Sequence, residues 1–146
     1  YKIDSFISYI SAKGDISVTD SERGIEINTE SLWFDREDEL LVISSWFEID
    51  DTTEELYAQA GSLRYDMKNE KLEMGMQVTL FKIADGEVMK CTSESVIYDK
   101  SSGMLTLKGG AKVVWKGDNY EAQIITVDTN DNTISLSGRI KGTING

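Results

Sequence analysis

Carboxylates are the most numerous side chains of this chain that could support chemistry, with 26 Asp and Glu residues against 15 Lys and Arg. The chain has no histidine, which excludes Ser–His and Cys–His nucleophiles and most zinc sites. Its one cysteine, Cys91, lies in an alternating strand pattern and is predicted to be a small packed residue. The Gly109-Gly110 pair lacks the spacing and the following helix of a phosphate-binding loop. We therefore predict no catalytic residues and no cofactor.

The carboxylates leave two alternatives open. Two of them about 5–10 Å apart in a cleft could hydrolyse a glycoside. Asp50-Asp51, or Asp128 with Asn130 and Asp131, could hold calcium, although the spacing is not that of an EF-hand loop. Most of the acids lie in turn-like segments, where Asp and Asn bond to their own backbone. We therefore interpret them as solvated turn residues and predict neither an enzyme nor a metal site.

The charge balance narrows the range of partners. The chain carries 26 acidic and 15 basic residues, for a net charge of −11. Nucleic-acid binding depends on neutralising phosphates with basic side chains, so this charge excludes it as a function. The excess of acid is otherwise what a highly soluble protein shows. No stretch approaches the ~18 apolar residues that a membrane helix needs.

The sequence contains five copies of one strand–turn–strand unit, and this repeat predicts the fold. An aspartate preceded by an apolar residue recurs every 29 to 33 residues, at Asp4, Asp35, Asp66, Asp99 and Asp128. Apolar residues also recur three positions before each aspartate and six and eight positions after it. Their period of two places them on one face of a strand, and the polar residues between them predict a turn opened by the aspartate. Glycines that follow most units predict a bulge or a bend, at Gly14, Gly75, Gly109 and Gly138.

The repeat predicts one all-β domain over residues 1–146, a twisted open β-jellyroll in which two antiparallel sheets form a V-shaped sandwich. Residues 54–60 have helical propensity, but they align with strand segments of the other units and are predicted to be a strand. At most one short helix is expected, there or near Tyr1. Trp33, Trp46 and Trp115 do not share a repeat position, and each is predicted to pack in the core or a groove.

Several units resemble a known repeat. Residues 91–109 and 120–138, and the Leu63-Arg64-Tyr65-Asp66 unit, are similar to the OstA-like repeat of LptA-type lipopolysaccharide-transport proteins. The resemblance covers essentially the whole chain, through apolar alternation, Tyr-Asp and Gly. It implies a β-jellyroll in the periplasm whose interior carries the acyl chains of lipopolysaccharide or a related glycolipid. It also implies assembly with other jellyroll domains, or with further copies end to end, through the terminal edges at residues 3–11 and 139–144.

The resemblance also implies candidate site residues. The inward residues of the units would line the lipid groove: Phe34, Ile43, Leu63, Tyr65, Leu72, Met74, Val96, Tyr98, Leu105, Leu107, Ile125 and Leu136. Basic residues toward the C-terminus would meet the lipid headgroup: Lys108, Lys112, Lys116, Arg139 and Lys141. Two alternatives remain, namely a structural or protein-binding β-repeat module with a closed core, and a membrane-anchored LptC-like relative.

Overall fold

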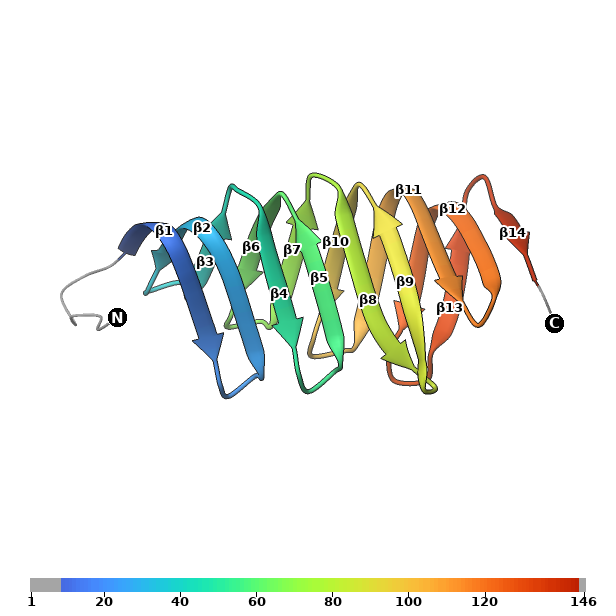
Figure 1. The fold of residues 1–146 in the computed structure, drawn as a ribbon, viewed down its shortest axis with the longest axis horizontal. Helices are drawn as coiled ribbons and strands as arrows, with labels where there is room; N and C mark the ends of the chain where they lie inside the picture. Colours follow the sequence, from blue (N-terminus) through green and yellow to red (C-terminus); the bar gives the residue numbers. More distant parts are fainter. Residues whose placement is uncertain (1–8, 145–146) are drawn as a thin grey trace.

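The computed structural model describes residues 9–144, and every regular element in this range is a β-strand (Figure 1). The predicted all-β class is therefore confirmed, and the segment with helical propensity contains strand β5. No helix in the described range is long and apolar enough to cross a membrane. The strands are β1 (Tyr9–Asp20), β2 (Ile25–Asp35), β3 (Leu40–Ile43), β4 (Phe47–Asp51), β5 (Leu56–Ala60), β6 (Ser62–Asp66), β7 (Lys71–Gly75), β8 (Val78–Ala84), β9 (Glu87–Ser93), β10 (Ser95–Asp99), β11 (Met104–Trp115), β12 (Asp118–Asp128), β13 (Thr133–Ser137) and β14 (Lys141–Thr143).

The described strands form one 14-stranded antiparallel sheet that folds over itself into two layers. Layer A contains β4, β5, β8 and β9, and layer B contains β3, β6, β7 and β10. The long strand β2 joins the layers at one end, because residues 25–29 pair with β4 and residues 33–35 pair with β3. The long strand β11 joins them at the other end, since residues 104–108 pair with β10 and residues 112–114 pair with β9. The predicted β-jellyroll is thus confirmed, with its two sheets continuous through these long strands.

One long side of the molecule, here called the bend edge, is where the chain crosses between layers. Consecutive short strands such as β5 and β6 are separated by a single residue, Gly61. A Cβ atom there would lie 2.7 Å from the Cβ of Met76, too close for any other residue without a shift. In β11 the ladder to β12 shifts register at Gly109-Gly110, where both residues have positive φ. The predicted glycine bend is confirmed at this position.

The opposite long side, here called the turn edge, carries the hairpin turns of both layers (Figure 1). In the turns of layer B, the repeated aspartate bonds to backbone N–H groups, as the sequence predicts. Oδ1 of the aspartate accepts a hydrogen bond from a backbone N–H two or three residues later. The four donor–acceptor pairs are Asp38 to Asp35 at 3.2 Å, Asn69 to Asp66 at 3.1 Å, Ser102 to Asp99 at 3.3 Å and Asn130 to Asp128 at 3.0 Å. The first copy, Asp4, lies outside the described residues.

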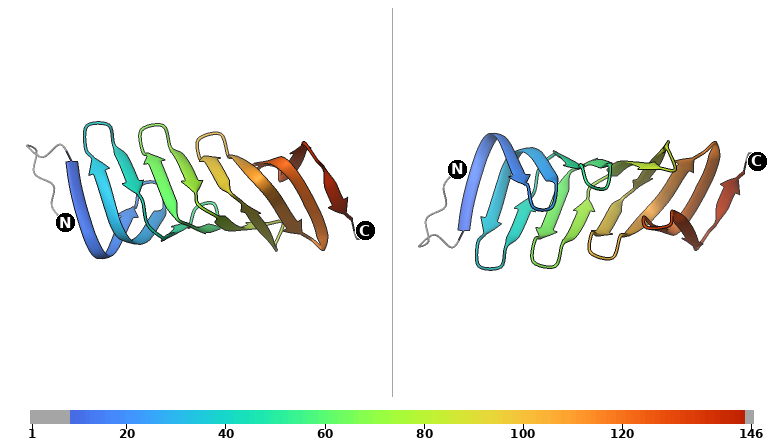
Figure 2. Two further views of the ribbon diagram at one scale, coloured as in Figure 1. Left: turned by 90° about the horizontal axis from the view of Figure 1, so that it is seen from above. Right: turned by 90° about the horizontal axis from the view of Figure 1, so that it is seen from below.

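Figure 2 shows the stack of hairpins from above and below. Buried side chains fill the space between the layers along the whole stack. Tyr65 and Tyr98 point inward and are 0% and 2% exposed, as the repeat predicts. Trp33 and Trp46 do not pack in the core, because they point outward and are 36% and 52% exposed, although Trp46 lines a shallow hollow over β1 and β2. Trp115 is partly buried, and its indole N–H donates to the Ala84 carbonyl at 3.1 Å.

Candidate functional site

The residues predicted to line a groove all lie on the inner face of layer B or of its extensions in β2, β11, β12 and β13. Phe34, at one end, and Leu136, at the other, are partly buried. The other ten are buried, with 2% of their surface or less exposed: Ile43, Leu63, Tyr65, Leu72, Met74, Val96, Tyr98, Leu105, Leu107 and Ile125. Antiparallel pairing between neighbouring strands, such as Leu63 with Met74, places these side chains next to one another. Layer B therefore supplies one continuous apolar wall.

Layer A supplies the opposite wall, which the sequence analysis did not assign. Its inward side chains are also buried: Ile25, Ile27, Phe47, Ile49, Leu56, Ala58, Val78, Leu80, Met89, Cys91, Ala111 and Val113. The signal for this wall was present, because the segments between the repeat units show the same period of two. Several of these side chains, such as Ala58, Cys91 and Ala111, are smaller than those of layer B.

Cys91 is an inward residue of layer A. The residue is 0% exposed, and burial raises the pKa of its thiol to about 12. A thiol with so little thiolate at neutral pH is inert to electrophiles until it meets solvent. The prediction of a small packed cysteine is confirmed.

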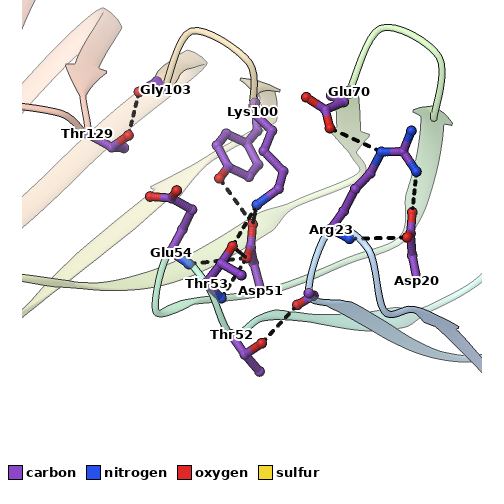
Figure 3. Close-up of polar contacts among 12 residues, drawn as sticks. Asp20, Arg23, Asp51, Thr52, Thr53, Glu54, Glu70, Lys100, Gly103 and Thr129 are labelled. Carbon is purple, nitrogen blue, oxygen red and sulfur yellow. Dashed lines mark hydrogen bonds and ion pairs between the residues drawn. The ribbon is translucent and has the colours of Figure 1, made fainter.

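A buried ion pair joins the two layers at the centre of the turn edge (Figure 3). The Lys100 ammonium, from a turn of layer B, lies 2.8 Å from Oδ2 of Asp51 at the end of β4 in layer A. Their side chains are 10% and 1% exposed. The Tyr98 hydroxyl donates to the same carboxylate oxygen at 3.2 Å. Oδ1 of Asp51 accepts from the Thr53 backbone N–H and hydroxyl at 3.1 and 2.7 Å, so both oxygens are engaged.

A similar contact lies at the preceding pair of turns. The Arg23 guanidinium in layer A reaches Asp20 at 3.0 Å and, across the edge, Glu70 of layer B at 3.1 Å (Figure 3). The Tyr65 hydroxyl donates to Asp20 Oδ2 at 3.3 Å, as Tyr98 does to Asp51. Burial, reinforced by the nearby aspartate charges, raises the pKa of both phenols well above the usual value, so both remain neutral donors.

A third contact lies at the next turns, where the Asn132 amide donates to Asp85 at 3.4 Å. We call these three sets the cross-layer contacts: Asp51 with Lys100 and Tyr98, Arg23 with Glu70 plus Tyr65 with Asp20, and Asn132 with Asp85. They join the two layers along the turn edge. At the two ends the interior is less covered, since Val18 in β1 and Ile134 in β13 are only partly buried.

Three of the five candidate headgroup residues come together in the structure. Lys112, Arg139 and Lys141 line one hollow at the bend edge near the C-terminal end. Glu121 shares this hollow and lies 3.6 Å from the Lys112 ammonium.

The other two candidates lie elsewhere. Lys108 lines a separate hollow over layer B, beside Arg64 and Glu73. Lys116 lies at the turn edge and pairs with Asp85 at 3.0 Å.

The calcium alternative fails at its first candidate pair. Asp50 and Asp51 point to opposite faces of β4, with Asp50 exposed and Asp51 buried against Lys100, so they cannot share an ion. At the second candidate, Asp128 and Asp131 bond to the turn backbone. Within residues 9–144, no three His, Cys, Asp or Glu side chains are grouped to hold a metal.

A stack of bent antiparallel hairpins around one apolar interior is the LptA-like class of β-jellyroll. One particular solved structure that it matches is LptH of Pseudomonas aeruginosa, described as the LptA-homologous periplasmic component of the conserved lipopolysaccharide transport device. The two share 15% sequence identity with a TM-score of 0.64, over 94% of this chain and 95% of LptH. No protein-family model and no curated protein sequence matches the chain. The likeness therefore establishes the fold.

Proposed function

We propose that this chain is a periplasmic lipid-binding transport protein, not an enzyme, that carries lipopolysaccharide or a related glycolipid between the inner and outer membranes. The observation that carries the proposal is the apolar interior, which runs from β1 to β13 between two walls of buried aliphatic and aromatic side chains. The shared fold with LptH supports the same role.

The interior can supply the binding energy without help from charge. Each methylene of an acyl chain contributes ~0.8 kcal/mol when it leaves water for an apolar site. A net charge of −11 therefore does not prevent acyl binding, although it repels an anionic headgroup at long range. The hollow lined by Lys112, Arg139 and Lys141 provides local positive charge, partly offset by Glu121, beside the C-terminal end of the interior, and is a candidate for contact with lipid phosphates at that end.

We expect photo-crosslinking to trap the lipid at inward positions. A photoreactive amino acid placed at Leu105 or at Tyr98, in cells that make lipopolysaccharide, should give an adduct of protein and lipid. Thr106 is the matched control, because it neighbours Leu105 on β11 but points away from the interior. Immunoblotting for both components measures the adduct. Adducts at Thr106 as strong as those at Leu105, or none at any inward site, would count against the proposal.

We also propose that the molecules assemble end to end through their terminal edges. In the described chain β1 pairs only with β2, and β14 pairs only with β12, so each has an edge without a neighbouring strand. Such edges readily accept another strand. Residues 3–8 of the predicted N-terminal edge lie outside the described residues, whereas β1 covers the remainder of it. An apolar interior partly open at both ends would then continue from one molecule into the next.

Truncation after Gly138 tests this assembly. It removes β14, and residues 139–144 are all exposed, so the layers should fold as before. Sedimentation velocity at about 100 µM is expected to show larger species for the full chain and mainly monomer for the truncated chain. An unchanged thermal midpoint serves as the control for folding. Equal association of the two chains would show that this edge is not the interface.

One observation favours a second function. Most interior side chains are 0–2% exposed, as in the closed core of a structural or protein-binding β-repeat module. That alternative predicts no lipid on the purified protein in native mass spectrometry, whereas a transport protein expressed in the same cells should retain some.

A further inference from the structure

The interior of the described chain is closed along both long sides, so a lipid must displace something to enter it. Side chains such as Tyr65, Leu72 and Leu105 are 0% exposed and pack between the layers. We propose that the two layers separate at the turn edge to admit an acyl chain, and that the cross-layer contacts hold this edge shut in the unloaded protein. This inference rests on the proposed function and adds the route that its ligand takes.

The bend edge is covalently continuous and cannot serve as that route. Each hairpin arm passes from one layer to the other there, within a few residues, as at Gly61 and Glu94. Backbone hydrogen bonds also join the bends to one another, for example from the Gly61 N–H to the Gly75 carbonyl at 3.1 Å and from the Glu94 N–H to the Gly109 carbonyl at 2.9 Å. Opening this side would break the sheet itself.

The turn edge is different, because only side chains are seen to join the layers there. The backbone hydrogen bonds at the described turns connect neighbours within one layer, from Thr52 to Gly24 in layer A and from Lys100 to Glu70 in layer B, both at 2.9 Å. Contacts between the layers include those of Asp51, Arg23 and Asn132 with their partners, and the hydrogen bond that the Lys100 ammonium donates to the Thr53 hydroxyl at 2.9 Å. The two layers can therefore part along this line with every strand pairing intact.

The chemistry of the cross-layer contacts suits an edge that opens and closes. An ion pair such as Asp51 with Lys100 loses hydration when it is buried, and it regains that hydration when the layers part. The recovered hydration offsets much of the lost attraction, so a polar closure opens at lower cost than an apolar one. Truncating one partner is a different event, because it leaves the other charge buried alone. The bends at Gly109-Gly110 and at Met76-Gln77, where φ is positive at all four residues, are suited to act as the hinge.

A short bismaleimide crosslink across the turn edge tests the inference. Asp85→Cys with Asn132→Cys places the two thiols where side chains of opposite layers now touch. Glu37→Cys with Lys68→Cys is the matched control, since the Lys68 ammonium contacts the Glu37 carbonyl at 2.7 Å between neighbouring turns of layer B. Both crosslinks tether turns, but only the first ties the layers together. Cys91 is buried and is left in place as a reporter.

The first measurement needs no lipid. The rate at which N-ethylmaleimide modifies Cys91 under native conditions, followed by mass spectrometry, reports how often the interior opens. We expect the crosslink between layers to slow this reaction at least tenfold relative to the control crosslink. Arg23→Cys with Glu70→Cys, crosslinked in the same way, should give the same result if the first pair folds poorly. Equal rates for the two kinds of crosslink would overturn the inference.

The second measurement is loading from rough-type lipopolysaccharide micelles, quantified as bound lipid after gel filtration. We expect the control crosslink to load like the unmodified protein and the crosslink between layers to load at least tenfold less. Equal loading would overturn the inference and leave the proposed function standing, with the ends as the route. A slowed Cys91 reaction without any loading of the unmodified protein would support opening at the turn edge and refute the proposed function.

Discussion

Replacing Asp51 with alanine is expected to lower the free energy of unfolding by about 3–5 kcal/mol. Asp51 is 1% exposed and accepts bonds from Lys100, Tyr98 and Thr53. Without the carboxylate, the Lys100 ammonium must either remain without its counter-charge or leave its site, and the Tyr98 hydroxyl loses its acceptor. Urea denaturation followed by tryptophan fluorescence measures the change, with the midpoint converted at constant slope.

Two further variants separate this effect from a general loss of charge. Asp50→Ala removes the neighbouring acid, which is exposed on the other face of β4, and should change stability by no more than about 0.5 kcal/mol. Asp51→Asn combined with Lys100→Met removes both charges and should recover most of the loss, because neither charge is then buried alone. A cost below about 1 kcal/mol for Asp51→Ala would mean that the ion pair is hydrated in solution and that the turn edge is already open.

Much of the fold follows from the sequence because one physical signal is repeated along it. The alternation around Asp35, Asp66, Asp99 and Asp128 specifies a strand, a turn and a second strand each time. A shift of register by one residue would turn every apolar side chain of a strand outward, so the pattern allows a single register. This is why the inward positions of layer B, including Tyr65 and Tyr98, are predicted correctly from the pattern.

The same alternation also exposes two tryptophans that chemistry alone would bury. Trp33 precedes the inward Phe34 within β2, and Trp46 lies just before β4, whose first residue Phe47 points inward, so both tryptophans project outward. Tryptophan prefers the interior because of its large apolar ring, whereas the backbone alternation determines which way each side chain points. Here the alternation outweighs that preference, and both rings point outward.

The cross-layer contacts could not be predicted from the repeat, because they join residues that no local pattern relates. Asp51 and Lys100 are 49 positions apart and belong to different layers. From the sequence alone, Asp51 resembles the many other acidic residues in turns. Only the pairing of β4 shows that its side chain points inward, on the same face as the buried Phe47 and Ile49. Its burial beside a lysine depends on how the layers meet, which strand periodicity does not contain. The same limit applies to the headgroup candidates, because the repeat does not show that Lys112, Arg139 and Lys141 share one hollow while Lys108 and Lys116 lie elsewhere.

Replacing Phe47 with alanine should be nearly as damaging, at about 3–5 kcal/mol in the free energy of unfolding. Phe47 is 0% exposed and is among the largest inward side chains of layer A. Its cross-strand neighbours are Thr29 and Ala60, which are too small to fill the space that a phenyl ring leaves. The cavity would therefore persist, which places the cost toward the upper part of the range for this substitution. Urea denaturation measures it on the same scale as Asp51→Ala.

Trp46→Ala is the matched control, because it removes an even larger ring from the adjacent position, where the side chain is 52% exposed. It should cost well under half as much, since partial burial forfeits little apolar area. The pair of variants asks whether the unloaded interior is packed or hydrated. If Phe47→Ala cost no more than Trp46→Ala, water would already fill the space between the layers, and nothing would need to part at the turn edge for a lipid to enter. If it costs several times more, the acyl chain must replace packed side-chain contacts, and its gain per methylene has to exceed what those contacts contribute.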